Sequence, residues 1–500
     1  LGGGGELLGD LTAVPAVLEH LLDAPELALG AAQALEQVVD GLLGQFHGSS
    51  RGVRWRLGHY TLGGMHFTQY YLDCLSQASY LIGDEGTGRA VVVDPRRDIQ
   101  EYLDDAAAAG LTIELIIETH FHADFLSGHL ELAEATGAAI GFGEVAKADF
   151  PIRPLADGER ISLGDVTLEI RATPGHTPES ISVVVYERAT DEVPYGVLTG
   201  DTLFIGDVGR PDLLSSIGVT ADDLGRRLYH SLHEKLLTLP DVTRVFPAHG
   251  AGSACGKNLS TETQSTIGEQ RETNYALSPM TEAEFVAVVT EGQPSAPGYF
   301  VFDATLNRKQ RELLDETEPP TPLTLDEVLA RQAEGAVVLD TREANDFSIG
   351  HLRGALNVGA GGRFAEYAGS VVDHDTPIVL VTDPGGELEA RVRLARIGFD
   401  TVVGVLAEPL AAFLTHPEVV ETSARVTAVE LEQGLDGVTL VDVRNPGEVQ
   451  LGMIDGARHI PVAELRRRLD ELDPSAPTVV YCAGGYRSIL AASLLRSAGF

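Results

Sequence analysis

The sequence predicts an α/β protein of several domains, and three observations lead to this prediction. The chain has 500 residues, which is more than a single hydrophobic core usually holds. From about residue 66 to 275, short apolar runs alternate with polar loops, as expected of buried strands joined by helices and turns. The C-terminal part contains an internal repeat in which strands and helices alternate, which is typical of a mainly parallel sheet covered by helices.

Composition excludes several classes of protein. Hydrophobic residues make up 44% and charged residues 22%, which is ordinary for a globular chain. The 74 acidic and 36 basic residues give a net charge of -38, which argues against nucleic acid and anionic membrane surfaces as partners. No apolar run reaches the roughly 20 residues that a membrane span needs. The three cysteines, Cys74, Cys255 and Cys482, exclude a disulfide scaffold, and we therefore expect a cytoplasmic enzyme.

The predicted domains follow from local patterns. Residues 1–64 carry no recognisable chemistry, and Met65 opens a strand-like run, so we expect an N-terminal extension before a natural start near Met65. A front domain is predicted over 65–275, with strands at 90–94, 115–119 and 182–185 among others. Residues 276–322 are rich in proline and acidic residues and are predicted to form a partly packed linker.

The internal repeat defines the rest of the chain. Residues 338–342 match 440–444, and 350–355 match 452–457 at the same offset. In both copies a helix, a strand, a turn and a helix ending in Gly-Phe follow. Residues 323–420 and 424–500 are therefore predicted to be two copies of one α/β domain. Because the second copy stops at Phe500 directly after a helix, we expect it to be truncated at its C-terminus.

Histidines and aspartates cluster at the ends of four predicted strands of the front domain. A single histidine in such a place is most often structural. Loops at strand ends on a rigid sheet are, however, where sites are usually built, and imidazoles with carboxylates at four such ends indicate a metal centre. The residues concerned are His120, His122 and Asp124 at the first end, then His176, Asp201 and His249.

This spacing resembles the metallo-β-lactamase superfamily, in which a His-x-His-x-Asp-His motif is followed by Gly-His, Gly-Asp and a final His. The resemblance covers 66–275 and implies an αββα sandwich. Phe125 stands where the motif has its last histidine, and a phenyl ring cannot coordinate a metal. We therefore expect one metal with open coordination positions instead of two.

The ligand types favour iron. Two imidazoles and one carboxylate, from His120, His176 and Asp201, form the facial triad of mononuclear iron(II) oxygenases. Residues 118–124, 171–178 and 228–235 resemble the persulfide dioxygenases more than glyoxalase II. The resemblance implies one Fe(II) per chain on that triad.

The same resemblance implies the chemistry and the surrounding groups. O2 and the persulfide of a low-molecular-weight thiol, usually glutathione in the family, would yield sulfite and thiol, and the sequence leaves the carrier open. His122, Asp124 and His249 would orient the ligands and bound water. Arg210 and Tyr229 match family residues near the substrate.

Two further side chains leave alternatives open. The charge of Arg210 holds either a substrate carboxylate or the loop that contains Asp207 and Asp212. Cys255 is expected near the iron, with Lys257 favouring its thiolate, and has either a structural role or a role as a persulfide relay. Cys74 lies in a strand-like stretch and is expected to be core packing.

A second chemical feature lies in the last domain. A predicted strand leads into Cys482-Ala-Gly-Gly-Tyr-Arg487, and a helix is expected from Ser488. Backbone N–H groups, the helix dipole and Arg487 should lower the pKa of the Cys482 thiol. The loop resembles the active-site loop of rhodaneses, which implies a cysteine persulfide and sulfur transfer, although Met453 replaces the histidine of another rhodanese signature. The middle copy has no cysteine, and its acidic turn at 382–387 predicts an inactive domain retained for packing or docking.

The order of the three domains resembles the bacterial persulfide dioxygenase–sulfurtransferases. Because the two sites share one chain, we expect them to act in succession. Cys482 would either load sulfur from thiosulfate and make the persulfide that the iron oxidises, or pass persulfide sulfur to the sulfite product and yield thiosulfate. Two other functions stay open: a zinc-dependent thioester hydrolase of the glyoxalase II type, which needs two metals, and a protein that binds or senses a sulfur carrier. The sequence leaves open whether the chain forms a homo-oligomer.

Overall fold

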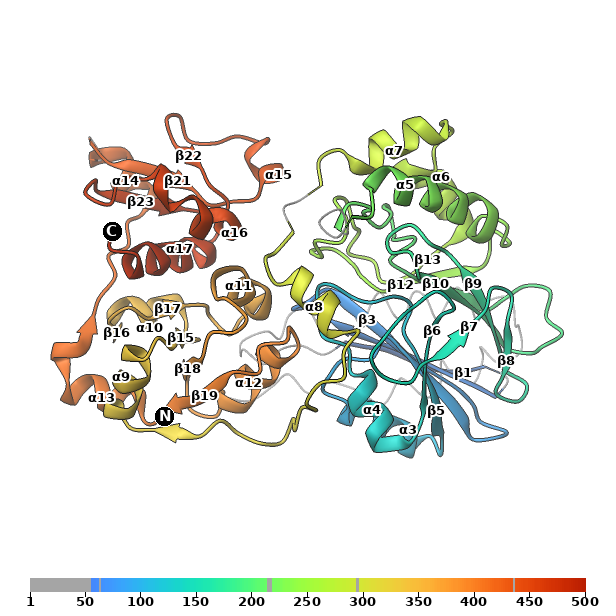
Figure 1. Ribbon diagram of the computed structural model, residues 1–500. Coiled ribbons are helices and arrows are strands. Elements are labelled where there is room, and N and C mark those ends of the chain that lie inside the picture. The colour runs from blue at the N-terminus through green and yellow to red at the C-terminus, as the bar shows by residue number, and fades with distance from the viewer. Residues whose placement is uncertain (1–54, 63, 214–217, 294–295, 435–436) are drawn as a thin grey trace, which may run out of the picture. The chain divides into compact units, whose positions relative to one another are not determined.

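The computed structural model describes residues 55–62, 64–213, 218–293, 296–434 and 437–500 (Figure 1). Residues 1–54 of the predicted extension lie outside the described residues. Strand β1 (Trp55–Leu62) pairs antiparallel with β2 (Met65–Leu72). The first sheet of the front domain therefore begins before the boundary predicted at Met65.

The front domain is a sandwich of two sheets. Among the described residues, one sheet has seven strands in the order β1 to β7 and the other six in the order β13-β12-β11-β10-β9-β8. Strand β4 shows how the layers form, because Val91 and Val93 face the second sheet while Ala90 and Val92 face the helices. The remaining strands are β3 (Gln77–Asp84), β4 (Arg89–Val93), β5 (Thr112–Ile117), β6 (Ala139–Gly143), β7 (Arg153–Leu155), β8 (Arg160–Ser162), β9 (Thr167–Ala172), β10 (Ile181–Tyr186), β11 (Gly196–Gly200), β12 (Arg244–Pro247) and β13 (Ser265–Thr266).

Helices cover both outer faces, which confirms the predicted αββα sandwich. Tyr102 and Leu130 pack on the first sheet, and Leu228 and Phe285 on the second. The first sheet is covered by α3 (Gln100–Ala108) and α4 (His129–Thr136), and the second by α5 (Ala221–His230), the π-helix η2 (Ser231–Leu236), α6 (Ile267–Thr273), the 3₁₀-helix η3 (Tyr275–Leu277) and α7 (Glu282–Thr290).

The predicted linker is more ordered than expected. It contains α7 and α8 (Phe300–Leu306), and Phe285 and Phe300 are buried in two different clusters. These helices are short, and prolines and acidic residues flank them, so the sequence shows no regular helical spacing of apolar residues here.

The two repeated domains have parallel sheets, as predicted. The main sheet of the middle domain has the strand order β14-β19-β18-β15-β17, and all pairings in this sheet are parallel. A separate pair, β16 with β20, is antiparallel. In the last domain the order of the described strands is β22-β21-β23, again parallel. The middle domain comprises β14 (Pro322–Leu323), α9 (Leu325–Ala333), β15 (Val337–Asp340), α10 (Ala344–Ile349), β16 (His351–Leu352), β17 (Leu356–Asn357), α11 (Phe364–Val371), β18 (Ile378–Val381), α12 (Glu387–Ala395), β19 (Val402–Leu406), α13 (Pro409–Thr415), η4 (Pro417–Val419) and β20 (Val420–Glu421). The last domain comprises α14 (Ala428–Gly434), β21 (Thr439–Asp442), α15 (Pro446–Val449), β22 (Arg458–His459), α16 (Val462–Leu465), η5 (Arg466–Glu471), β23 (Thr478–Tyr481) and α17 (Tyr486–Ser497).

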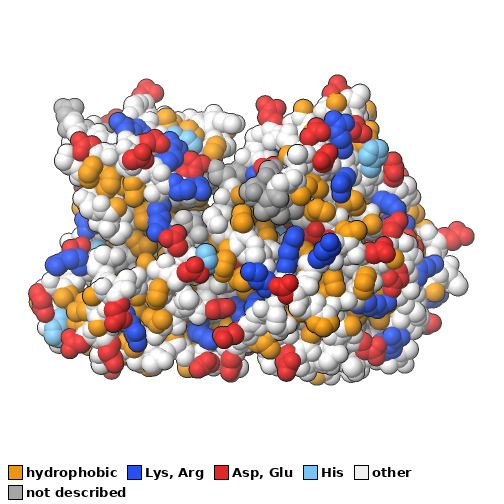
Figure 2. Space-filling model, in the orientation of Figure 1, with side chains coloured by type: hydrophobic (Ala, Val, Ile, Leu, Met, Phe, Trp, Pro, Cys, Tyr) orange, Lys and Arg blue, Asp and Glu red, His pale blue; other side chains and the backbone are white. Residues whose placement is uncertain are grey.

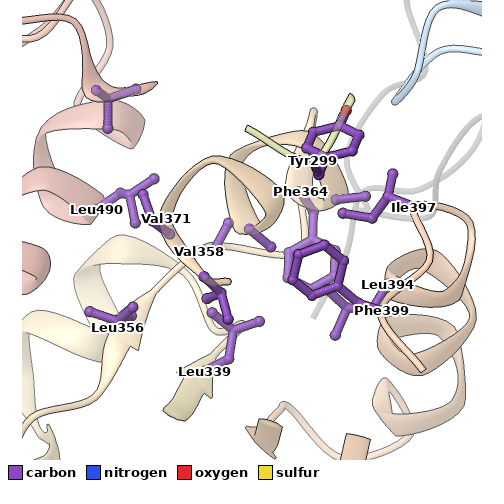
Figure 3. Packing of buried hydrophobic residues seen from close by; sticks show 14 of the residues in the cluster. Tyr299, Leu339, Leu356, Val358, Phe364, Val371, Leu394, Ile397, Phe399 and Leu490 are labelled. Carbon is purple, nitrogen blue, oxygen red and sulfur yellow. The ribbon is translucent and has the colours of Figure 1, made fainter. Parts of the chain in front are cut away.

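One apolar cluster contains residues of all these regions, and we call it the joining cluster. It includes Phe125 and Cys255 of the front domain, Tyr299 beside α8, Phe364 of α11 and Leu490 of α17. Figure 3 shows Phe364 next to Tyr299 and Leu490 farther along the same cluster. Within the described part of the chain, no helix combines the length and the apolar composition that crossing a membrane requires.

Candidate metal centre and candidate sulfur-transfer site

Three predicted ligands meet where strands of both sheets end. His120 follows β5, His176 follows β9 and Asp201 follows β11. The Nε2 atoms of His120 and His176 lie 3.7 and 3.5 Å from Oδ2 of Asp201. All three side chains are buried, and their ligand atoms lie within 4.8 Å of one another. The structure therefore brings together the two imidazoles and one carboxylate that the sequence predicted as metal ligands.

A glycine allows two of these strand ends to approach. Gly200 has a φ of +52°, and a Cβ atom there would lie 2.7 Å from Oγ1 of Thr119. Because the residue before His120 thus touches the residue before Asp201, the two ligands are held side by side.

Each imidazole has one nitrogen engaged in a hydrogen bond on the side away from Asp201. Nδ1 of His176 donates to the carbonyl of Arg210 over 2.9 Å. Nδ1 of His120 lies 3.0 Å from Oγ1 of Thr119, which donates its own proton to Asp94. Burial lowers the pKa of both histidines, so both are neutral and their Nε2 atoms carry lone pairs.

The unsatisfied atoms of this group fit a cation. Nε2 of His120 and Oδ2 of Asp201 are buried and have no hydrogen-bond partner among the described residues. Burial alone would raise the pKa of Asp201, but His249 and His120 hold it well below its usual range, so the side chain is a carboxylate. A buried polar atom without a partner costs about 1–3 kcal/mol, which a metal ion at this point would offset. His120, His176 and Asp201 would therefore hold the metal.

The other predicted group lies directly beside these ligands. Nδ1 of His249 is 2.7 Å from Oδ1 of Asp201, and its Nε2 is 2.7 Å from Oδ2 of Asp124. Burial alone would lower the pKa of His249, but the charges of Asp124 and Asp201 raise it well above its usual value. His122 joins this group, and the ring of Phe125 lies 4.4 Å from the His122 ring. An imidazolium between two carboxylates would orient Asp201, and the supporting role of this group stays a prediction.

Asp94 is a site residue that the sequence analysis did not identify. It follows β4 with a φ of +51°, which is uncommon for a residue other than glycine. Its carboxylate accepts the N–H and the hydroxyl of Thr119 and lies 3.1 Å from Nε2 of His122. The sequence could have indicated Asp94 as a site residue, because it stands at the end of the predicted 90–94 strand and every predicted ligand also follows a strand.

Of the two alternatives for Arg210, the structure favours the loop. Nε and Nη2 of Arg210 each lie 2.7 Å from the Asp212 carboxylate, and Nη1 donates to the carbonyl of Ala254. Asp207 accepts the backbone N–H groups of Lys257 and Asn258. These bonds hold the loop at several points, and it presents the Arg210 carbonyl that orients His176.

Cys255 lies near the ligands, as expected, but its thiolate is not favoured. It is buried beside Asp201 and His249. Burial, followed by the charges of Asp124 and Asp201, raises its pKa well above the usual value. Lys257 does not offset this effect, because its Nζ binds the carbonyls of Val288 and Glu291.

Cys74 belongs to none of the candidate ligand groups that the described residues form, and the contacts of Tyr229 are with other residues. Cys74 is in the turn between β2 and β3 and not in a strand; it is half-buried against the joining cluster, 3.9 Å from Nη1 of Arg396. The Tyr229 ring packs on His233 and Phe285, and its hydroxyl donates to the carbonyl of Met280. In the described part of the chain these contacts belong to the helices over the second sheet, and the predicted substrate contact stays a prediction.

A cavity of about 660 Å³ opens beside Ala123, which lies between His122 and Asp124. Ala123, Arg210 and Asp212 line one side, α8 contributes Phe300 and Ala304, and Arg467 of the last domain also reaches it. Lys147, Arg308 and Lys309 bring further positive charge to a chain that is strongly acidic overall. Figure 2 shows Lys and Arg side chains gathered near the place where Figure 1 has α8. The cavity is thus suited to an anionic molecule with an apolar part.

The second candidate site is the loop of Cys482. Helix α17 begins at Tyr486, two residues before the predicted start, and the N–H of Gly485 donates to Sγ of Cys482 over 3.1 Å. Burial alone would raise the pKa of this thiol, but hydrogen bonds from Ser488, Gly485 and Gly484 bring it below its usual value. Arg487 forms a two-pronged ion pair with Glu448 at 2.5 and 2.8 Å. The loop therefore favours a thiolate, mainly through its backbone N–H groups and the hydrogen bond with Ser488.

Comparisons with known proteins agree with this geometry. The family model of the metallo-beta-lactamase superfamily matches residues 72–249, and that of the rhodanese-like domain matches 324–415 and 427–500. The mitochondrial persulfide dioxygenase ETHE1 of Bos taurus is 32% identical over 46% of this chain and 83% of its own length. The Homo sapiens protein of that name is 33% identical over 42% of this chain and 75% of its own. A crystal structure described as a metallo-beta-lactamase from Staphylococcus aureus is 34% identical, with a TM-score of 0.62, and covers 69% of this chain and 99% of its own.

Proposed function

We propose that the front domain oxidises the persulfide of a low-molecular-weight thiol with O2 at a single iron(II). The chain belongs to the persulfide dioxygenase family within the metallo-beta-lactamase superfamily, and this membership supports the proposal. The observation that carries the proposal is the buried group of His120, His176 and Asp201, with neutral imidazoles and unsatisfied ligand atoms. Phe125 beside the second group supports one metal instead of two.

The balanced reaction is R-S-SH + O2 + H2O giving R-SH and sulfurous acid, which ionises to sulfite. Iron(II), when bound, would supply the redox chemistry that adds oxygen to the outer sulfur. The chain's own residues do the rest. Thr119 and the Arg210 carbonyl fix the rings of the two histidines, and His249 fixes Asp201. The cations of the adjacent cavity would attract an anionic carrier.

We further propose that Cys482 acts on the sulfite product in a second step, which uses a second molecule of the persulfide. Its thiolate attacks the outer sulfur of R-S-SH, releases R-SH and forms the Cys482 persulfide. Sulfite then takes the outer sulfur, which yields thiosulfate and returns the thiolate. The lowered pKa of Cys482 supports this role, and fusion of the two sites in one chain raises their effective concentration. We also propose that the reaction takes place in the cytoplasm, where the three thiols would stay reduced.

Metal content and oxygen uptake test the proposal together. We expect about one iron per chain and O2 consumption with one or more thiol persulfides. His176→Ala should remove both, because two remaining ligands hold iron poorly. His230→Ala is a suitable control, since His230 is exposed and forms its ion pairs with Glu234 and Glu282, away from the ligand group.

Other results would favour the alternatives. Two zinc ions per chain with thioesterase activity would identify a glyoxalase II-like hydrolase. Tight binding of a persulfide carrier without oxygen uptake by the iron-loaded protein would identify a binding or sensing protein.

A further inference from the structure

The loop that carries His122, Asp124 and Phe125 depends on groups from outside the front domain. Its backbone N–H and carbonyl groups are buried, and such groups need partners. Several of those partners come from the region after α8 and from the middle domain. The metal loop therefore owes part of its conformation to residues about 180 or more positions later in the chain.

Asn307, directly after α8, makes most of these contacts. Its Nδ2 donates to the carbonyls of His122 and Phe125, each over 2.8 Å, and its Oδ1 accepts the N–H of Ser127 over 2.9 Å. The side chain is 1% exposed. Arg311 adds a hydrogen bond to the carbonyl of Ser127. The side-chain amide of Asn307 thus forms hydrogen bonds with three backbone groups of the loop that follows His120.

The middle domain supplies a further contact. The N–H of Leu126 donates to the carbonyl of Arg396, at the end of α12, over 2.6 Å. The guanidinium of Arg396 binds both oxygens of Asp98 at 2.8 and 2.7 Å, and both side chains are buried. Arg97 in turn binds the carbonyl of Ala395 and the carboxylate of Asp400. These bonds fix the end of α12 against the metal loop.

We propose that Asn307 is a positioning residue of the metal centre and that the cysteine-less domain, through the Arg396 carbonyl, completes the same support. This inference rests on the proposed function only in taking the ligand group as a metal centre. The domain without a thiol thereby has a structural role, because it holds the loop whose His122 and Asp124 lie against the ligands and their partner His249.

Cobalt(II) binding to the metal-free full chain tests the proposal without any oxygenase assay. Removal of such supporting contacts typically weakens metal binding by about 10–100-fold, and we expect Asn307→Ala to fall in this range and to change the visible cobalt spectrum. Asn307→Asp keeps the volume and the acceptor but loses the donated bonds, so it should weaken binding as well.

Asn357→Ala is the matched control. Asn357 is fully buried in the middle domain and also donates to two backbone carbonyls, those of Asp340 and Arg342. We expect a similar loss in Tm but an unchanged cobalt affinity. Equal cobalt affinity and spectra for wild type, Asn307→Asp and Asn357→Ala would overturn the proposal, as would equal losses of affinity in the two alanine variants.

A second measurement covers the case in which Asn307 variants do not fold. Asp98→Asn weakens the contact to Arg396 and should increase hydrogen exchange in a peptide spanning 121–128 as well as weaken cobalt binding. Unchanged exchange and affinity in Asp98→Asn would also contradict the proposal. Failure of the wild type to bind cobalt would instead reject the metal centre itself, and the two failures are therefore distinguishable.

Discussion

The middle and last domains are two copies of one fold, and the turn that carries Cys482 in the last domain has a different chemistry in the middle one. Both keep an aspartate–arginine pair, Asp340 with Arg342 and Asp442 with Arg444, and each arginine also binds the carbonyl of a glycine eight residues later. The turn before the next helix is different. In the last domain the N–H of Gly485 donates to the Cys482 sulfur, whereas in the middle domain that of Gly385 donates to the Glu387 carboxylate.

Between the two domains, both the hydrogen bonding of the turn and the charge of its side chains differ. Where the last domain has a thiol and Arg487, the middle domain has Thr382 and Glu387 at the corresponding positions. A carboxylate that occupies the loop N–H group both removes a donor and repels an anionic sulfur. Loss of activity in the middle domain thus involves the whole turn and not the cysteine alone, and three experiments can test this view.

The largest effect is expected for Cys482→Ser. Sulfur transfer should fall at least about 10³-fold, because the nucleophile is lost. Oxygen uptake should remain, and the product should change from thiosulfate to sulfite, as chromatography of the two anions would show. Identical product ratios from wild type and variant would contradict a coupling of the two sites.

A smaller effect is expected for Arg487→Glu, which gives the last domain the charge of the middle one. The new carboxylate, near Glu448, should raise the pKa of Cys482, and one pKa unit lowers the thiolate fraction about tenfold at a pH below both values. The thiolate exists above its pKa, so the rise of the alkylation rate should move to higher pH. Arg496→Gln, on the same helix, is the control; its profile should match that of the wild type. An unmoved profile for Arg487→Glu would mean that the hydrogen bonds alone set the pKa.

The smallest effect concerns the middle domain. In a Cys482→Ser background, Thr382→Cys should not restore sulfur transfer, because Glu387 holds the N–H of Gly385. Adding Glu387→Arg should raise the alkylation rate of the new thiol by up to about tenfold. Restored transfer with Thr382→Cys alone would show that only the cysteine distinguishes the two copies.

Much of the fold follows from local pattern. The runs at 90–94 and 182–185 are β4 and β10, and the repeat found by offset is a pair of parallel sheets. Errors occur where local pattern misleads. Cys74 follows the apolar end of β2 but lies in a turn, and the proline-rich segment after residue 276 hides two packed helices.

In the candidate site, too, some residues can be predicted from local sequence and others cannot. His120, His176 and Asp201 can be found because each stands at a strand end in a recognisable motif. Asn307 and Arg396 cannot, because their contacts to the metal loop join positions far apart and involve the carbonyl or N–H that every residue has. The raised pKa of Cys255 also depends on Asp124 and Asp201, whose approach only the folded chain shows.

The joining cluster has a consequence for how this chain can be handled. Its apolar side chains come from the front domain, from α8 and from both repeated domains. Cutting between domains would expose this surface to water, at a cost of about 25 cal/mol for each Å². Isolated fragments should therefore aggregate, and heat should melt the described part of the chain in one cooperative transition instead of domain by domain.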